Sequence, residues 1–177
     1  MLARKNPDHF KPSHGKLKFT DIDFAALHAQ GINYLIIDVD NTLAVHKGPQ
    51  VEPQVLAHLQ AAVAAGYIKG FCLLSNAIIP KKSRRARLKA IAEQAGTDKL
   101  FLATIWTHLK PHPNPYRKAL ALLGNPNPST VLMIGDQLFT DVLGANRLGI
   151  HSLMVEPLGE DPFYITWKRR REKKYNL

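Results

Sequence analysis

The residues with the clearest chemical potential are Asp38 and Asp40, which directly follow the apolar segment 34–37. Side chains two positions apart in an extended chain point to the same side, so both carboxylates can face one point. Two like charges held that close repel each other unless a proton or a cation lies between them. The pair therefore predicts a divalent-metal site. The alternative is a polar turn after a strand, since Asp and Asn are common turn residues.

Polar residues also follow the other segments that we expect to form strands, at 67–74, 100–103 and 131–134. Each has an ordinary explanation as well: a serine at a strand end, an exposed lysine before a turn proline, or an acid favoured near a helix N-terminus. Together they indicate a site for a cation and a phosphate. The candidates are Thr42 near the first strand, then Ser75 and Asn76, Lys110, and finally Asp136 and Asp141.

The elements that must position these residues alternate between strand and helix. A fifth strand is expected at 152–155, and helices are expected at 22–30, 53–66, 80–96, 115–124 and around 141–148. This alternation predicts an α/β fold of three layers, Rossmann-like, with a central parallel sheet and helices on both faces. Ligands of such sheets bind beyond the carboxyl ends of the strands, where all the candidates lie. We also expect Asp136 to meet Asp38 across a neighbouring strand, and Gly135 to let the chain turn close to a ligand.

The candidate ligands favour Mg²⁺, which takes one or two carboxylates together with water and phosphate oxygens. The chain has no cluster of histidine and cysteine, so zinc is not expected. Its single cysteine, Cys72, lies in an apolar run and suits a buried core position, which also excludes a disulfide framework. No segment resembles a signal peptide, and no apolar run reaches the ~20 residues of a membrane span. A cytoplasmic protein is therefore expected.

The net charge of +10 is concentrated in three segments, residues 1–20, 81–89 and 167–177, which together carry +15 and leave −5 for the rest of the 177 residues. Such patches attract anionic partners, whether phosphorylated substrates, an acidic membrane surface or nucleic acid. They can equally be solvated surface. In the helix at 80–96 the six basic residues are expected to face largely outward, opposite an apolar stripe. One domain covers 1–177, with an extended basic arm at 1–19, a catalytic core at 33–155 and a basic tail at 160–177.

Four segments resemble, in order, the motifs of the haloacid dehalogenase (HAD) superfamily of phosphatases: DVDNTL, LLSN, HLKP and GDQLFTD. The resemblance implies that Asp38 is the nucleophile that forms an aspartyl-phosphate, and that Asp40 protonates the leaving oxygen and then activates water. It implies that Lys110 neutralises the phosphoryl group. Mg²⁺ would be bound by Asp38, the main-chain carbonyl of Asp40 and Asp136, with Asp141 supporting that set. Ser75 is implied as a phosphate contact, and we expect Thr42 and Asn76 to contribute to substrate binding.

The intervals between these motifs leave no room for a cap domain, which matches the capless subfamily IIIA. Within it, the chain resembles the YqeG-type family, itself similar to phosphatidylglycerophosphate phosphatases; the lead-in FKPSHGKLKFTDIDFAALHAQGI and the segment IGDQLFTDVLGANRLG carry this likeness. The implied reaction is hydrolysis of a phospholipid head group at a membrane face. The tail DPFYITWKRRREKKY has the composition of a peripheral anchor, or of a helix that packs on the body.

Two other functions remain open from the sequence. A phosphatase of nucleic-acid or protein phosphate ends would use the same residues. A nucleic-acid or ribosome-associated interaction protein could retain the fold and bind through the basic segment 81–89. A large substrate, or an oligomer whose neighbour covers the pocket, would suit the open site, and the oligomeric state is left undecided.

Overall fold

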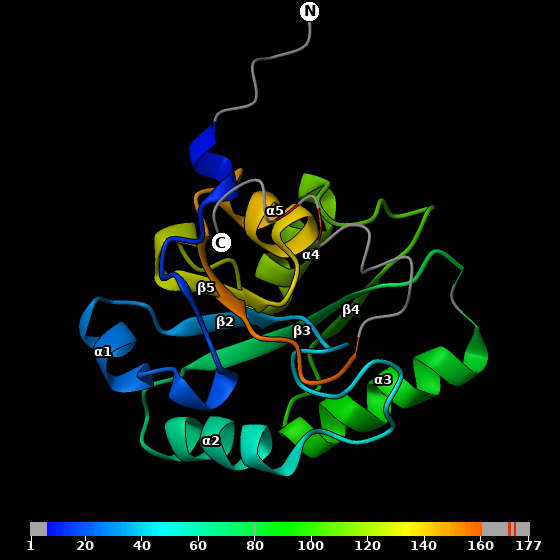
Figure 1. Ribbon diagram of the computed structural model, residues 1–177, viewed down its shortest axis with the longest axis horizontal. Helices are drawn as coiled ribbons and strands as arrows, with labels where there is room; N and C mark the ends of the chain where they lie inside the picture. Colours follow the sequence, from blue (N-terminus) through cyan, green and yellow to red (C-terminus); the bar gives the residue numbers. More distant parts are fainter. Residues whose placement is uncertain (1–6, 80, 161–169, 171, 173–177) are drawn as a thin grey trace, which may run out of the picture.

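The computed structural model of the chain describes residues 7–79, 81–160, 170 and 172. Its centre is a parallel six-stranded sheet in the order β1-β6-β5-β2-β3-β4 (Figure 1). The strands are β1 (Lys16–Leu17), β2 (Tyr34–Ile37), β3 (Gly70–Asn76), β4 (Leu100–Ala103), β5 (Val131–Gly135) and β6 (His151–Val155). All of the predicted strands are present, and β1 is an addition.

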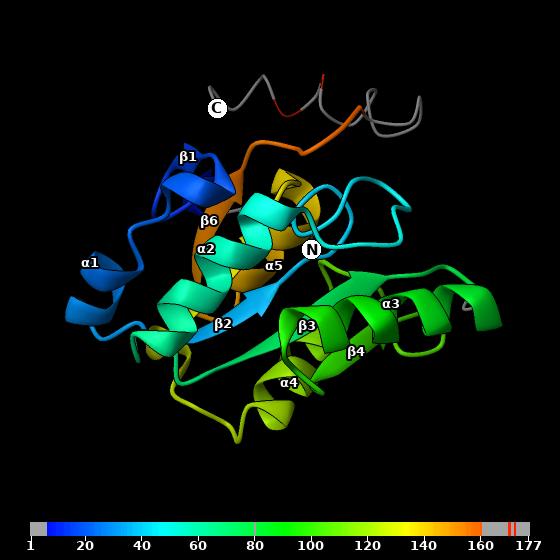
Figure 2. The same ribbon diagram turned by 90° about the horizontal axis from the view of Figure 1, so that it is seen from below.

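Helices cover both faces of this sheet, as the three layers in Figures 1 and 2 show. Side chains along each strand alternate between the two faces: Leu35 and Ile37 join one core cluster, and Ile36 joins the other. The first cluster lies beneath α1 (Phe24–Ala29), α2 (Pro53–Ala64) and α3 (Lys82–Ala95), and the second beneath α4 (Pro113–Leu122) and α5 (Leu143–Asn146). The expected three-layer α/β fold is confirmed.

Several short elements complete the described chain. They are the 3₁₀ turns η1 (Pro7–Phe10), η2 (Phe19–Asp21) and η3 (Pro128–Thr130), and the π-helical segment η4 (Leu138–Val142) that leads into α5. The helix expected at 22–30 begins only at Phe24, because the Asp23 carboxylate accepts a hydrogen bond from the Ala26 amide at 2.9 Å and caps it. The strand expected at 67–74 is shifted to 70–76, so Ser75 and Asn76 belong to it and pair with β4.

The expectation of an extended arm at 1–19 is wrong for its described part, because residues 7–19 pack on the sheet. Strand β1 pairs with β6, and the Phe10 side chain is buried against Leu143 and Met154. Residues 1–6 lie outside the described residues. Most of the predicted tail at 160–177 does too, although Glu172 is described and accepts a hydrogen bond from the Leu138 amide at 2.9 Å. None of the helices in the described part of the chain is long and apolar enough to cross a bilayer.

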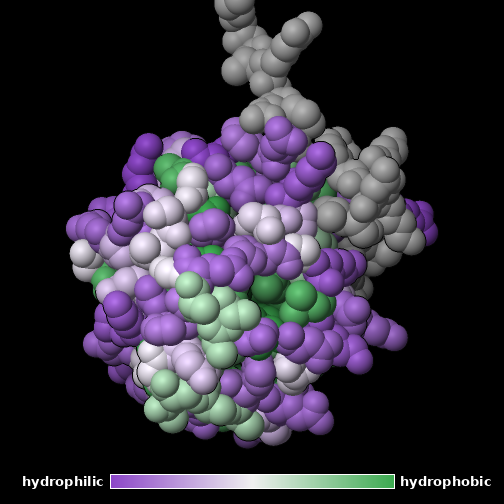
Figure 3. Space-filling model, turned by 90° about the vertical axis from the view of Figure 1, so that its left-hand side faces the viewer, coloured by the Kyte–Doolittle hydropathy of each residue, from purple (hydrophilic) through white to green (hydrophobic). Residues whose placement is uncertain are grey.

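The middle of the sheet is the topological switch point. From β2 the chain proceeds to β3 and β4 on one side, and from β5 it proceeds to β6 on the other, while β2 and β5 lie side by side. Open parallel sheets bind ligands outside the carboxyl ends of the strands at such a point. The switch point therefore places the expected site at the carboxyl ends of β2 and β5. Figure 3 shows the molecule from the other end, at the amino ends of these strands, where hydrophilic residues dominate the surface and hydrophobic ones show in a restricted area.

Candidate active site

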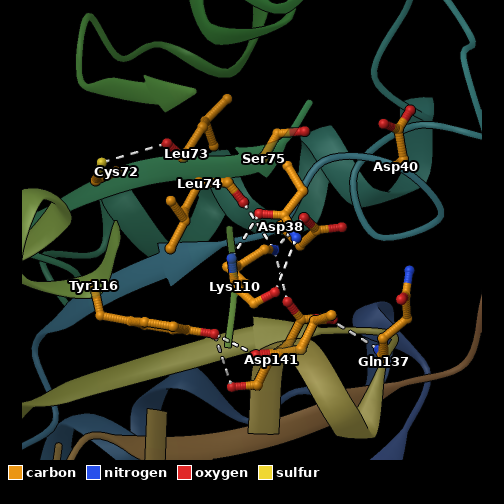
Figure 4. A network of polar contacts seen from close by, with 12 residues as sticks. Asp38, Asp40, Cys72, Leu73, Leu74, Ser75, Lys110, Tyr116, Gln137 and Asp141 are labelled. Carbon is orange, nitrogen blue, oxygen red and sulfur yellow. Dashed lines mark hydrogen bonds and ion pairs between the residues drawn. The ribbon is translucent and has the colours of Figure 1, made fainter. Parts of the chain in front are cut away.

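The centre of the site is the Lys110 ammonium group, which is almost fully buried at 5% exposure. Its Nζ donates to Asp38 Oδ1 at 2.6 Å, to Asp141 Oδ1 at 2.7 Å and to the Leu74 carbonyl at 3.0 Å (Figure 4). An ammonium has three N–H donors, so each has one acceptor and the group is fixed in place. The loop after β4 thus supplies a cation to the carboxyl ends of β2, β3 and β5.

Burial and charge act against each other on these groups. Burial alone would lower the pKa of Lys110, but the Asp141 and Asp38 carboxylates outweigh it and raise this pKa above its usual value. Burial raises the pKa of Asp38 to about 7, with Lys110 opposing the shift and the Asp141 charge adding to it. A further positive charge close to Asp38 would therefore stabilise its ionised form.

Asp38, Asp136 and Asp141 form the candidate metal site. Each of these buried residues offers one carboxylate oxygen, and the three oxygens lie within 4.8 Å of one another. Hard carboxylate oxygens are the donors that Mg²⁺ takes in proteins, and this group of three includes neither a thiolate nor an imidazole. The residues present fit a divalent cation of that class. The expected proximity of Asp136 to Asp38 is confirmed by the direct pairing of β2 with β5.

We expected Gly135 to let the chain turn close to a ligand, whereas the structure gives it a steric role beside Asp141. A Cβ atom built on it would lie 2.4 Å from Cγ of Asp141 and 2.5 Å from its Oδ2. The missing side chain therefore leaves room for the Asp141 carboxylate, whose Oδ2 also accepts the Gln137 amide hydrogen bond at 3.1 Å. On the other side, the buried Tyr116 hydroxyl donates to the Thr140 carbonyl. The Gln137 amide thus holds the Asp141 carboxylate, and the Tyr116 hydroxyl holds the main chain next to it.

Asn76 and Ser75 lie at the end of β3, and their side chains bind different partners. The Asn76 side chain binds both main-chain groups of Lys110: its Oδ1 accepts from the amide at 2.9 Å, and its Nδ2 donates to the carbonyl at 3.3 Å. This pairing positions the lysine. Ser75 Oγ accepts from Arg84 Nη2 at 3.4 Å and lines the same pocket as Asp38. The role of each in substrate binding stays a prediction.

Asp40 is separated from the acidic cluster and is held by two arginines. Its carboxylate accepts from Arg87 at 2.7 Å, from Arg84 at 3.0 Å and from the Lys47 amide at 2.9 Å. Burial would raise the pKa of Asp40, but the Lys47 amide and both guanidinium groups lower it overall. In Figure 4 the Asp40 carboxylate points away from Lys110. The structure therefore does not bring both aspartate carboxylates of the first motif to one point.

Arg84 and Arg87 are the residues that sequence reasoning missed. The basic residues of α3 were expected to face largely outward, yet these two turn inward to Asp40. A signal was present: Arg84, Arg87, Leu88 and Ile91 recur at the helical spacing of three and four, so both arginines continue the apolar stripe toward the sheet. The physical reason for the inward turn is the Asp40 carboxylate, which lies across the interface between α3 and the loop after β2.

A pocket of about 420 Å³ lies at the carboxyl end of the sheet. Its wall includes Asp38, Asp40, Ser75, Asn76, Arg84 and Lys110. A larger cavity of about 880 Å³, between the far ends of α2 and α3, contains none of the predicted site residues. Three candidates, Thr42, Asp136 and Asp141, are buried and are not part of the pocket wall. Asp136 and Asp141 still join Asp38 in the acidic cluster, whereas the Thr42 hydroxyl has no hydrogen bond that would connect it to these groups in the described part of the chain.

Comparison with known sequences agrees with this geometry. The model of the family described as "Mitochondrial PGP phosphatase" matches residues 2–158. The Bacillus subtilis protein named "Probable phosphatase YqeG" is 27% identical over 148 residues, which cover 84% of this chain and 78% of that protein. The Chlamydomonas reinhardtii protein named "Phosphatidylglycerophosphate phosphatase 1, chloroplastic" is 28% identical over 155 residues, which cover 86% of this chain but only 55% of that protein.

Solved structures agree on the fold. An uncharacterized protein from Listeria monocytogenes superposes with a TM-score of 0.58 at 19% identity, covering 74% of this chain and 84% of that one. A protein from Cytophaga hutchinsonii described as a "possible sugar phosphatase, HAD superfamily" gives a TM-score of 0.55 at 12% identity, covering 87% and 94% of the two chains. With the family match over most of its length, the chain belongs to the mitochondrial PGP phosphatase family and is a phosphoric monoester hydrolase.

Proposed function

We propose that the protein is a Mg²⁺-dependent phosphatase that forms an aspartyl-phosphate on Asp38 and removes the terminal phosphate of phosphatidylglycerophosphate. The observation that carries this proposal is the buried Lys110 ammonium shared by Asp38 and Asp141 at the switch point of the sheet. The substrate is the one that the names of the family and of the algal relative give for those proteins. We further propose that the protein acts as a peripheral protein on the cytoplasmic face of a membrane.

Asp38 suits the role of nucleophile because one of its oxygens is held and the other is available. Lys110 binds Oδ1, while Oδ2 accepts no hydrogen bond from the described residues, and the carboxylate lines the pocket. Attack of Oδ2 on phosphorus would form the acyl phosphate and break the bond to the leaving oxygen. The fixed position of Lys110 keeps the carboxylate from rotating as the substrate approaches.

Repulsion between the two anions is the main obstacle to this attack. A phosphate monoester and a carboxylate are both negatively charged, and Lys110 provides one positive charge at the point where they meet. A divalent cation bound by Asp38, Asp136 and Asp141 would neutralise the phosphate oxygens further. Ser75, on the same pocket wall, is placed to donate its hydroxyl to a phosphate oxygen. The chain thus supplies orientation and charge compensation before any bond is made.

Asp40 would act as the acid in the first step and as the base in the second, and its surroundings determine its protonation state in each. Arg84 and Arg87 hold it as a carboxylate, which is the form that takes a proton from water when the aspartyl-phosphate is hydrolysed. Protonation of the leaving oxygen needs the acid form. A substrate phosphate in the pocket would compete with Asp40 for Arg84, and loss of that guanidinium contact raises the pKa of the Asp40 carboxyl. Substrate binding would then favour the proton on Asp40.

The mechanism is tested with a soluble aryl phosphate, which needs no membrane. Asp38→Asn should abolish turnover while the protein still folds, because Asn keeps the size of the side chain, its amide oxygen can still accept from Lys110, and Asp141 still compensates the ammonium charge. EDTA should silence the wild type, and added Mg²⁺ should restore it. Acid-quenched enzyme should carry labile phosphate on the chain. Turnover by Asp38→Asn at the wild-type rate would remove Asp38 as the nucleophile.

The substrate is tested separately with a panel of phosphatidylglycerophosphate in vesicles, a mononucleotide, a sugar phosphate and a 5′-phosphorylated oligonucleotide. We expect the highest kcat/KM on the lipid. A higher kcat/KM on the oligonucleotide would reject the lipid assignment and favour a phosphatase of nucleic-acid ends. Loss of the lipid preference in the presence of detergent would show that the preference depends on the bilayer.

A further inference from the structure

Four large apolar side chains are exposed together beside the pocket. Ile78 and Ile79 follow β3, and Ile105 and Trp106 follow β4; Ile78 and Trp106 are 66% and 69% exposed. The two loops lie side by side, because the Ala77 amide donates to the Ala103 carbonyl at 2.7 Å and the Ile105 amide to the Ile78 carbonyl at 3.4 Å. Both loops extend from the carboxyl ends of their strands (Figure 1). We call this set of four residues the apolar rim.

The apolar rim differs from the other exposed apolar residues. Val63 on α2 and Leu122 on α4 are less exposed, and each stands alone on its helix, which is normal for a soluble protein. The rim instead gathers three isoleucines and a tryptophan on adjoining loops. Contiguous apolar surface of this kind marks an interaction site, and tryptophan is favoured where a protein meets the interface of a bilayer.

Exposed positive charge adjoins the rim. Lys81, Lys82 and Arg85, at the start of α3, come within six residues of Ile79 in the chain, and they are exposed. None of the three forms an ion pair with another described residue, in contrast to Arg84 and Arg87 on the same helix, which bind Asp40. Apolar side chains for insertion next to unpaired cations are the combination that binds an anionic lipid surface.

The rim also continues into the pocket. Ile78 and Ile79 form part of the wall of the pocket that Asp38 and Lys110 also line, as does Leu109 at the end of the second loop. A lipid whose acyl chains stay in the bilayer could therefore place only its head group in the pocket, with apolar side chains against the bilayer and charged ones against the phosphate. This arrangement explains how an open site could act on a substrate that is too large to enclose.

We propose that the apolar rim, with Lys81, Lys82 and Arg85, docks the protein on an anionic bilayer and directs the pocket at the lipid head groups. The proposal deepens the proposed function and rests on it for the identity of the substrate. The docking itself rests on the position, exposure and charge of these two loops and of the start of α3. It assigns membrane contact to described residues of the core rather than to the segment 160–177.

The experiment is co-sedimentation of the full-length protein with vesicles of phosphatidylglycerol and phosphatidylcholine, and with vesicles of phosphatidylcholine alone. The test variant is Ile105→Ser/Trp106→Ser, because neither residue lines the pocket and both are exposed. The matched control is Val63→Ser/Leu122→Ser, which removes exposed apolar surface elsewhere. We expect the test variant to bind anionic vesicles at least about tenfold more weakly than the wild type, and the control to bind as the wild type does.

A second variant tests the charge. Lys81→Gln/Lys82→Gln/Arg85→Gln should weaken binding to anionic vesicles by roughly a hundredfold, since each basic residue near such a surface contributes about a fivefold effect, and should change binding to neutral vesicles little. Turnover of the soluble aryl phosphate should be unchanged in all these variants. Wild-type binding by the rim variant would overturn the proposal, and so would wild-type protein that does not bind anionic vesicles.

Three further outcomes distinguish the docking from a contact between copies of the chain and from the proposed substrate. A rim variant that binds vesicles normally but changes its sedimentation coefficient would show that the rim is a contact between copies of this chain, and would overturn the docking. Wild-type protein that binds vesicles through the rim but leaves phosphatidylglycerophosphate intact would support the docking and reject the proposed substrate. Hydrolysis of that lipid without any effect of the rim variant on vesicle binding would do the reverse.

Discussion

Replacing Lys110 with methionine tests whether the ammonium holds the site together. Methionine has nearly the same length and no charge, so Lys110→Met removes three hydrogen bonds of 2.6, 2.7 and 3.0 Å with little change in volume. It leaves the Asp38 and Asp141 carboxylates buried and facing each other without their shared cation. Removing one partner of a buried ion pair costs about 3–5 kcal/mol, because the remaining charge is uncompensated.

For a chain of this length, that loss corresponds to a fall in melting temperature of roughly 6–20 °C. The assay is thermal unfolding in EDTA, followed by the same measurement in Mg²⁺. The variant has one more uncompensated negative charge at the acidic cluster, so Mg²⁺ should stabilise it more than it stabilises the wild type. The matched control is Lys118→Met on the exposed side of α4, which should change the free energy of unfolding by less than about 0.5 kcal/mol. A Lys110→Met protein that melts with the control and keeps wild-type turnover would refute the reasoning.

Three other substitutions test the surroundings of the site. Gly135→Ala should displace the Asp141 carboxylate, which lies 2.4 Å from the new Cβ, and lower kcat on the aryl phosphate by roughly a hundredfold, whereas Gly70→Ala, with 3.8 Å to its nearest neighbour, should not. Asn76→Ala should lower kcat with little change in KM if Asn76 positions Lys110; a rise in KM alone would show that it binds substrate. Arg87→Gln should destabilise the protein by about 1.5–3 kcal/mol at pH 7. Because Arg87 lowers the pKa of Asp40, the part of this difference that comes from the ion pair should be lost as the pH falls through that lowered pKa, and only the part from the Arg87 hydrogen bond to the Gly48 carbonyl should remain; a difference of constant size across that pH range would exclude the ion pair as a cause.

The parts of the site that the sequence predicted are those that depend on local geometry and on one rule of topology. An apolar segment that ends in an acid can be recognised within a few residues, and parallel strands bring their carboxyl ends to one edge of the sheet. These two rules were enough to predict that Asp38, Lys110, Asp136 and Asp141 lie close together. The same spacing rule failed for Asp40, because β2 already ends at Ile37 and the Asp40 carboxylate is bound instead by Arg84, Arg87 and the Lys47 amide.

Other features depend on partners far away in the chain and could not be read from spacing alone. Strand β1 has two residues, too few for any alternating pattern, and it exists because β6 offers an edge. Ile78, Ile79, Ile105 and Trp106 have the composition of core residues, and only the position of their loops beyond the ends of β3 and β4 shows that they are exposed. Composition directed the expectation of membrane contact to the three basic segments and that of an anchor to the C-terminal tail, whereas the exposed apolar side chains indicate the edge of the pocket.

In the proposed mechanism, the pairing of Asp40 with Arg84 and Arg87 would link substrate binding to proton transfer. An acid held by two guanidinium groups remains ionised at neutral pH, so the free enzyme keeps Asp40 in the form that cannot protonate a leaving group. Arg84 is the arginine of the pair that also lines the pocket, and it lies beside Ser75, where a phosphate would bind. A substrate that carries a second anionic group could bind this guanidinium and release Asp40 to accept its proton. The phosphodiester of a phospholipid head group is such an anion, and it would add to the competition for Arg84 that the transferred phosphate already exerts.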